Sequence, residues 1–194
     1  MSKFVFIGLG NPGEQYAQTR HNAGWMALDT LVHLWQDPAI PAHWRAEKKI
    51  YGEVLKITHG AHEIMCIKPD TFMNESGKAA LAAAKWFLDT DPSAKPDQTF
   101  KNIVVLHDDL DIVAGEYKLK FATGPRVHNG YNSVIESLQS DQFWSARIGI
   151  DAREGDRTLP GKAYVLQKAP PQEHERLVQA IHTLAEELPY IVLQ

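Results

Sequence analysis

The chain has 194 residues, and its composition is close to that of an average globular protein. Hydrophobic residues make up 44%, charged residues 23% and aromatic residues 9%, which excludes disordered, collagen-like and coiled-coil classes and predicts a single domain over residues 1–194. Twenty basic against 24 acidic side chains give a net charge of −4. A nucleic-acid partner therefore requires a local basic patch.

The cysteine content and the hydropathy pattern bear on the compartment. Cys66 is the only cysteine, so the chain can form neither an internal disulfide nor a cysteine-based zinc cluster, as is typical of a reducing compartment. The apolar run before Gly8 is too short for a signal peptide, and no apolar stretch reaches the roughly 18 residues of a membrane span. We expect a soluble, cytoplasmic protein that contacts no membrane.

The first part of the chain predicts a strand, a helix and a hairpin. Residues 3–7 are apolar and β-prone and run into a glycine-rich turn, which indicates a buried strand. Apolar residues at helical spacing predict a helix over residues 22–35, and a loop follows over 38–45. Two short β-prone runs, 51–58 and 63–67, predict a hairpin.

The next segments continue the alternation of helices and strands. An alanine-rich helix extends to about residue 88, and Asn74 is placed to cap it. After a loop over residues 89–101, the continuous apolar run 103–106 is typical of a central strand, with Asp108 just beyond its end. A further strand is predicted over residues 115–121.

The last third of the chain predicts a helix over residues 129–138, strands over 146–150 and 163–166, and a loop over 151–161 between these two strands. Pro170 and Pro171 open a final helix, which Pro189 closes. These elements predict an α/β fold, a single domain whose mixed twisted sheet carries helices on both faces.

The first turn carries glycines at positions 8, 10 and 13, the spacing of a dinucleotide-binding fingerprint. That fingerprint requires a helix that begins at once and an acidic residue about 20 positions on. Here the helix begins only near Asn22, so a dinucleotide-dependent oxidoreductase is a distant alternative. The turn does place Asn11 at the carboxyl end of a strand, where open α/β sheets bind ligands.

A histidine and an aspartate are candidates for acid–base chemistry. His21 lies in a polar segment before the first helix, and a loop histidine held by a carboxylate is a common general base. Asp108 is expected at the same sheet edge and could orient the imidazole. Asp108, Asp109 and Asp111 could instead bind a divalent metal, although no ligand set accompanies them.

Nucleophilic catalysis has little support in the sequence. No serine lies in a G-x-S-x-G turn, and Cys66 lies within an apolar strand where a thiolate would be costly. The neutral amides of Asn11, Asn74 and Asn129 could bind a polar substrate and hold an attacking water, whereas helix capping explains the last two without function.

Several ordered motifs together resemble the bacterial peptidyl-tRNA hydrolase family, over about residues 4–166. They are Gly8-Leu-Gly-Asn-Pro-Gly13, Tyr16, Thr19-Arg-His-Asn-x-Gly24, Lys68-Pro-x-Thr-Phe-Met-Asn-x-Ser-Gly77, His107-Asp-Asp-Leu-Asp111, His128-Asn-Gly130 and Arg147-Ile-Gly-Ile150.

The resemblance implies a metal-free, cofactor-free and monomeric esterase that cleaves peptidyl-tRNA at the 3′ terminus and recycles the tRNA of stalled translation. His21 would be the general base and Asp108 its orienting acid, while Asn11 and Asn74 would position water or polarise the ester carbonyl. The residues expected to bind substrate or tRNA are Tyr16, Phe72, Met73, His128, Asn129, Lys118, Lys120 and Arg147.

The segment before His128 departs from the family pattern. Family members usually carry a run rich in Gly and His there, whereas residues 122–127 read Ala-Thr-Gly-Pro-Arg-Val. Asp109 stands where Glu is more usual, and Asp151 where Gly is common. The altered segment keeps open the alternative of a non-catalytic RNA-binding relative.

Positive charge is concentrated in the middle of the sequence. Residues 115–168 carry eight basic and six acidic side chains, whereas residues 1–114 carry 11 and 14 and the last 26 residues one and four. The middle segment, which holds Lys118, Lys120, Arg126 and Arg147, is where we expect phosphate contacts.

Overall fold

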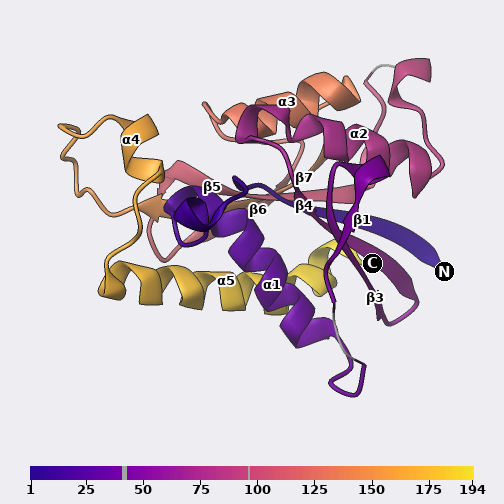
Figure 1. Cartoon of the computed structure of the whole chain (residues 1–194), viewed down its shortest axis with the longest axis horizontal. Helices are drawn as coiled ribbons and strands as arrows, with labels where there is room; N and C mark the ends of the chain where they lie inside the picture. Colours follow the sequence, from indigo (N-terminus) through magenta and orange to yellow (C-terminus); the bar gives the residue numbers. More distant parts are fainter. Residues whose placement is uncertain (41–42, 96) are drawn as a thin grey trace.

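The computed structural model describes residues 1–40, 43–95 and 97–194, which form one seven-stranded mixed sheet (Figure 1). The strand order is β2-β3-β4-β1-β5-β7-β6, in which the central strands β4, β1, β5 and β7 are parallel and the outer pairs are antiparallel. The strands are β1 (Ser2–Gly8), β2 (Arg45–Glu47), β3 (Gly52–His59), β4 (His62–Pro69), β5 (Phe100–Val113), β6 (Tyr117–Phe121) and β7 (Phe143–Asp151).

Helices cover both faces of the sheet. Figure 1 shows α2 and α3 on one face and α1 and α5 on the other, which confirms the predicted fold class. The helices are α1 (Ala23–Trp35), α2 (Gly77–Trp86), α3 (Asn129–Leu138), α4 (Gly161–Val165) and α5 (Pro171–Val192).

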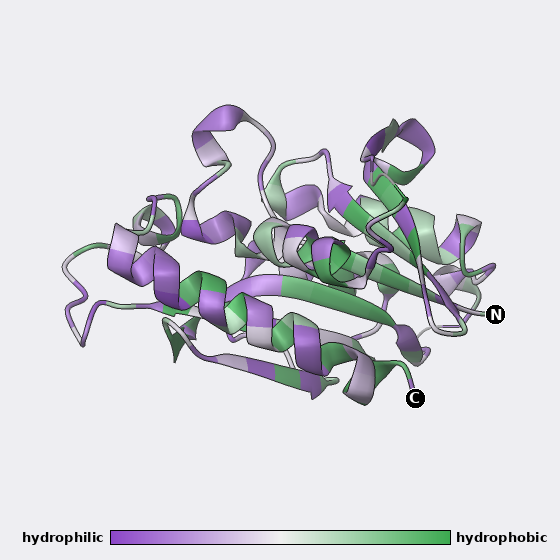
Figure 2. Ribbon diagram, turned by 90° about the horizontal axis from the view of Figure 1, so that it is seen from below, coloured by the Kyte–Doolittle hydropathy of each residue, from purple (hydrophilic) through white to green (hydrophobic). Residues whose placement is uncertain are grey.

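Alternation along β1 divides the core in two. Phe4 and Phe6 pack into the cluster beneath α1 and α5, whereas Val5 and Ile7 pack into the cluster beneath α2 and α3. Successive side chains of a strand point to opposite faces, so a strand covered on both sides is apolar throughout. Figure 2 shows the resulting pattern, with hydrophobic strands inside and helices that alternate between hydrophobic and hydrophilic residues. None of the described helices has the length and apolar character that crossing a bilayer requires.

Three sequence predictions about local structure were wrong. The segment 163–166, predicted as a strand, lies in and after the short helix α4, which follows Pro160. Pro189 does not close the last helix, because α5 continues to Val192. In this last stretch of α5, Leu188 and Val192 are buried in the core, so their packing offsets the hydrogen bond that proline cannot donate.

The start of α2 also differs from the prediction. Asn74 lies in a 3₁₀ turn, η4 (Met73–Glu75), and Ser76 is the residue that precedes the first turn of α2. Asn74 is exposed, it is not the residue that precedes α2, and no side-chain hydrogen bond caps that helix.

Several strands are longer than predicted. β5 is 14 residues long, so Asp108 lies within the strand rather than after it. The predicted loop 38–45 includes residues 41–42, which lie outside the described ranges, and its last residue, Arg45, begins the short edge strand β2. The predicted loop 89–101 likewise includes residue 96, outside the described ranges, and it contains a 3₁₀ turn, η5 (Pro92–Ala94). Its last two residues, Phe100 and Lys101, were wrongly predicted as loop and belong to β5.

Candidate active site

His21 and Asp108 meet where the central strands end. His21 lies in the 3₁₀ turn η2 (Arg20–Asn22), which leads into α1, and its Nδ1 is 2.8 Å from Oδ1 of Asp108. Pairing between β1 and β5 stops at Gly8 and Leu106, so Asp108 is the second residue of β5 beyond the end of its neighbour. The Asp108 side chain is 3% exposed and that of His21 14%, so a small part of the imidazole is accessible.

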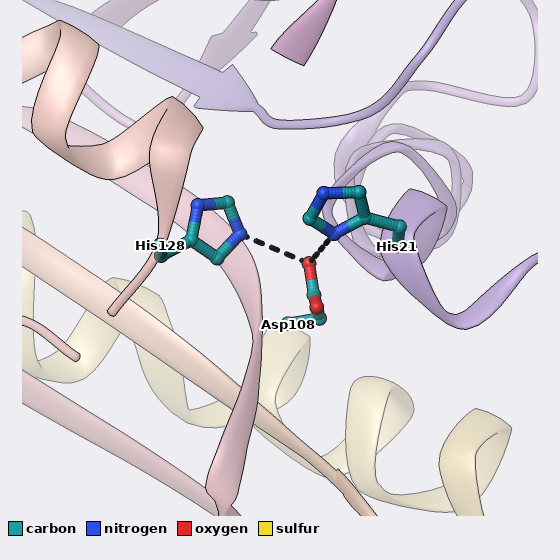
Figure 3. Close-up of side chains that lie close together, drawn as sticks. All are labelled: His21, Asp108 and His128. Carbon is teal, nitrogen blue, oxygen red and sulfur yellow. Dashed lines mark hydrogen bonds and ion pairs between the residues drawn. The ribbon is translucent and has the colours of Figure 1, made fainter. Parts of the chain in front are cut away.

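The carboxylate controls the protonation of the imidazole. Burial lowers the pKa of His21, but the charge and hydrogen bond of Asp108 outweigh burial and raise the pKa above its ordinary value. Because Nδ1–H donates to Asp108, Nε2 is the atom that can take a proton. Figure 3 shows this second nitrogen turned away from Asp108.

His128 is a second donor to the same carboxylate oxygen (Figure 3). Its Nε2 is 3.0 Å from Oδ1 of Asp108, and its Nδ1 accepts the backbone N–H groups of Gly130 and Tyr131 at the start of α3. A nitrogen that accepts two N–H groups carries no proton, so the proton of His128 is on Nε2. The resemblance implies that His128 contacts the substrate, but it is buried and both of its nitrogens are bound to protein groups.

The two histidines hold Asp108 ionised. Burial alone would raise the pKa of Asp108, but His21 and His128 reverse this effect and bring the pKa well below its usual range. A carboxylate that accepts two hydrogen bonds in a buried site is fixed in both charge and direction.

The same three side chains have the composition of a metal site. One ligand atom from each of His21, Asp108 and His128 lies within 4.8 Å of the others. A metal on Nε2 of His128 would move its proton to Nδ1, against the N–H groups of Gly130 and Tyr131 that Nδ1 accepts. Because Nδ1 of His128 accepts these N–H groups at the start of α3, a proton is favoured over a metal ion between Nε2 of His128 and Asp108.

The alternative of a metal at the three aspartates is also disfavoured. Asp109 binds Nε of Arg147 at 2.6 Å and the backbone N–H of Asp111, while Asp111 lies 3.9 Å from Nε of Arg126. With Asp108 bound to two histidines, the three carboxylates have separate partners and do not converge on one point.

His107 is a buried histidine whose structural place we did not predict. Its ring lies edge-on to His128, with centroids 5.1 Å apart, and its nitrogens bond to the Asp108 carbonyl and to Oγ of Ser145. Burial lowers its pKa to about 3, so it is neutral and supports the His128 ring. The signal that could have revealed its position is the alternation of side chains along a strand. Because His107 directly precedes Asp108, its side chain is expected on the opposite face of β5.

The glycine-rich turn has a packing function, which accounts for its resemblance to the dinucleotide fingerprint. A Cβ on Gly8 would lie 2.4 Å from the carbonyl oxygen of Gly24, and one on Gly24 would lie 2.3 Å from that of Leu106. The backbones of the turn, of α1 and of β5 therefore approach one another with no room for a side chain.

The turn presents Asn11, which is buried at 7% exposure. Its Oδ1 accepts the backbone N–H of Met73 at 2.9 Å, and its backbone bonds to the side chain of Asn22. Because Oδ1 faces an N–H group, Nδ2 of Asn11 is the group available to donate.

One contact, between Met73 and Gly130, joins two of the segments that carry predicted substrate-binding residues. Met73 is buried, and a Cβ on Gly130 would lie 2.4 Å from its sulfur, so η4 and the start of α3 are in contact. The side chains of Asn74 and Asn129, on either side of that contact, are exposed. Phe72 is 58% exposed, and Tyr16 is half-buried at the end of η1 (Glu14–Tyr16).

The expected phosphate-binding residues lie on β7, which pairs with β5, and on β6, the edge strand beyond β7. Lys118 and Lys120 on β6 are exposed, and Lys118 is paired with Arg147 of β7. Arg147 is in turn paired with His107, next to Asp108, and its ion pair with Asp109 engages Nε. Lys118 and Lys120 are thus the freer cations, and Arg147 can reach a phosphate only with its remaining guanidinium nitrogens.

A buried ion pair that we did not predict anchors the turn of His21. Arg20 binds Glu173 of α5 through two nitrogens, at 2.5 and 2.7 Å, and both side chains are less than a tenth exposed. The same guanidinium donates to the carbonyls of Tyr164, Gln167 and Lys168. The residue beside the candidate base is therefore fixed to the C-terminal part of the fold.

A buried carboxylate that orients a partly exposed imidazole, next to amide donors and exposed cations, defines a hydrolase that activates water by acid–base chemistry. Cys66, the only cysteine, is buried, and burial raises its pKa to about 12, so it is not a nucleophile.

Comparison with known proteins identifies the family. The model of the family described as peptidyl-tRNA hydrolase matches residues 5–194. The peptidyl-tRNA hydrolase of Neisseria meningitidis serogroup A is 40% identical over 174 residues, which are 90% of this chain and 82% of that protein. That of Dichelobacter nodosus is 39% identical over 178 residues, 91% of this chain and 85% of that protein. The crystal structure of peptidyl-tRNA hydrolase from Acinetobacter baumannii has a TM-score of 0.80 at 29% identity and covers 98% of this chain and 88% of that one.

The chain belongs to the peptidyl-tRNA hydrolase family. Its activity is cleavage of the ester bond between the peptide and the tRNA of peptidyl-tRNA. The family confirms the predicted enzyme class, and the contact between His21 and Asp108 favours an active enzyme over the alternative of a non-catalytic RNA-binding relative.

Proposed function

We propose that His21 is the general base of this hydrolysis and that Asp108 orients it. The observation that carries the proposal is the 2.8 Å contact between His21 Nδ1 and Asp108 Oδ1. It fixes the tautomer that leaves Nε2 free and stabilises the imidazolium that forms when Nε2 accepts a proton.

The reaction needs one water and no covalent intermediate. Nε2 of His21 takes a proton from water as its oxygen bonds to the ester carbonyl carbon. The tetrahedral intermediate then collapses, the bond to the 3′-ribose oxygen breaks, and the imidazolium returns the proton to that oxygen. Asn11 and Asn74 donate hydrogen bonds to the developing oxyanion. These side chains suffice without a metal or a cofactor.

The proposed substrate-binding residues are those that the resemblance to the family implies, apart from the buried His128. We assign Tyr16, Phe72, Met73 and Asn129 to the peptide and the terminal adenosine. Lys118, Lys120 and Arg147 would bind backbone phosphates of the acceptor end, a contact that does not depend on sequence. We further propose that the enzyme acts as a monomer in the cytoplasm, where its substrate arises.

The proposal is tested by replacing the base. His21→Ala is expected to lower the turnover of an N-blocked aminoacyl-tRNA by about 10²- to 10⁴-fold, the range of general acid–base catalysis. Its affinity for tRNA should stay within about twofold of wild type, because the phosphate contacts are made elsewhere. Unchanged turnover would contradict the assignment of the base.

A further inference from the structure

Asn22 is fully buried at the end of η2, and its carboxamide makes two hydrogen bonds to the backbone of Asn11. Its Oδ1 accepts the N–H of Asn11 at 2.9 Å, and its Nδ2 donates to the carbonyl of Asn11 at 3.0 Å. The two partners are a backbone donor and a backbone acceptor, so the orientation of this amide is set by chemistry.

Hydrogen bonds thus hold both the backbone and the side chain of Asn11. Asn22 fixes its backbone, and the N–H of Met73, 2.9 Å away, fixes its side-chain oxygen. The ring of Trp25 closes the turn from another side, since a Cβ on Gly10 would lie 2.7 Å from that ring. Because the backbone and Oδ1 of Asn11 are both hydrogen-bonded, the orientation of its Nδ2–H groups is fixed.

From this arrangement we infer that Asn22 is a positioning residue for catalysis, which acts by aiming the amide of Asn11 at the ester carbonyl. The inference rests on the proposed role of Asn11 as an oxyanion donor. His21 and Asn22 are adjacent in η2, so one short turn carries the base and also holds the backbone of Asn11, the proposed donor. A donor that is held in place before the reaction stabilises the transition state without reorganisation.

A double-mutant cycle in the full-length protein tests the inference. Asn22→Asp keeps an acceptor for the Asn11 N–H but loses the donor to the Asn11 carbonyl, with little change in volume. We expect its single-turnover rate to fall about tenfold or more, since a misplaced catalytic group can cost up to about 10² in rate. KM for an N-blocked aminoacyl-tRNA should stay within about twofold, because binding uses other contacts.

The double variant separates positioning from a general effect on the fold. If Asn22 acts through Asn11, Asn11→Ala/Asn22→Asp should be no slower than Asn11→Ala alone, within about twofold. Asn102→Asp is the matched control, because Nδ2 of Asn102 also donates to a backbone carbonyl, that of Lys3, at the other end of β5. The control should lose no activity.

The outcomes distinguish this inference from the proposed function. Full activity in Asn11→Ala would overturn the role of Asn11 and the inference with it. An impaired Asn11→Ala together with a fully active Asn22→Asp, or single effects that multiply in the double variant, would overturn the inference alone. If Asn22→Asp unfolds, Asn22→Ser in the same cycle supplies the comparison, with the same expected and contrary results.

Discussion

At the scale of single residues, the site depends on which ring nitrogens carry protons. His128 has two separate functions, because its Nδ1 caps α3 and its Nε2 donates a hydrogen bond to Asp108. A residue that caps a helix without reaching Asp108 should therefore remove one function and keep the other.

The pair His128→Asn and His128→Ala tests this separation. Asparagine is a good N-cap but too short to reach Asp108, so His128→Asn should keep the cap of α3 while it loses the hydrogen bond to Asp108, and turnover should fall. His128→Ala should lose a further ~1 kcal/mol because the cap is gone as well. Chemical denaturation together with turnover measures both; equal stability of the two variants would contradict the capping function.

Part of the site could be predicted from the sequence. His21 and Asp108 suit acid–base chemistry by residue type and position, and their functions were predicted because the motifs around them resemble those of the family. The functions of Asn22 and His107 were not, because each depends on hydrogen bonds to residues distant along the chain, from Asn22 to Asn11 and from His107 to Ser145. Spacing alone does not show which atoms face one another.

At the scale of elements, the ion pair between η2 and α5 connects the turn of the base to the C-terminal helix. Glu173→Gln should destabilise the protein by about 3–5 kcal/mol, because it leaves the buried guanidinium of Arg20 without its counter-charge. Glu186→Gln, an exposed position on the same helix, is the control and should change stability by less than about 0.5 kcal/mol. Thermal unfolding compares the two, and equal melting temperatures would contradict the structural role of the pair.

The errors in secondary structure have a common origin in tertiary packing. The four residues 163–166 have a β-prone pattern, but Tyr164 packs against the guanidinium of Arg20, 4.0 Å from its ring, and bonds through its hydroxyl to the carbonyl of Ile150. These distant contacts favour the helical turn of α4. Long apolar strands and regular helices such as β1 and α1 were predictable because their pattern repeats locally.

At the scale of the whole molecule, the net charge of −4 is compatible with a tRNA substrate because cations are gathered on β6 and β7. Lys118 and Lys120 are exposed on the strand at that edge of the sheet.

Removal of these two cations should weaken the binding of tRNA to the same extent whatever the tRNA sequence. Lys118→Ala/Lys120→Ala is expected to reduce the slope of log affinity against log salt by roughly one for each phosphate that the variant no longer neutralises. Lys162→Ala, an exposed cation on α4, is the comparison and should leave the slope unchanged. Titration of tRNA at several salt concentrations gives the slopes, and an identical slope in the double variant would place the phosphate-binding surface elsewhere.

The pH dependence of kcat/KM for an N-blocked aminoacyl-tRNA, in wild type and in Asp108→Asn, tests the central claim most directly. His21 acts as a base only when neutral, so the rate should rise with pH through its pKa, which Asp108 holds above the ordinary 6.5. In Asp108→Asn burial remains but the counter-charge is lost, so the inflection should move below that of wild type and the plateau should fall by about 10²-fold or more. An inflection at the same pH in both proteins would contradict the claim that Asp108 orients and tunes the catalytic histidine.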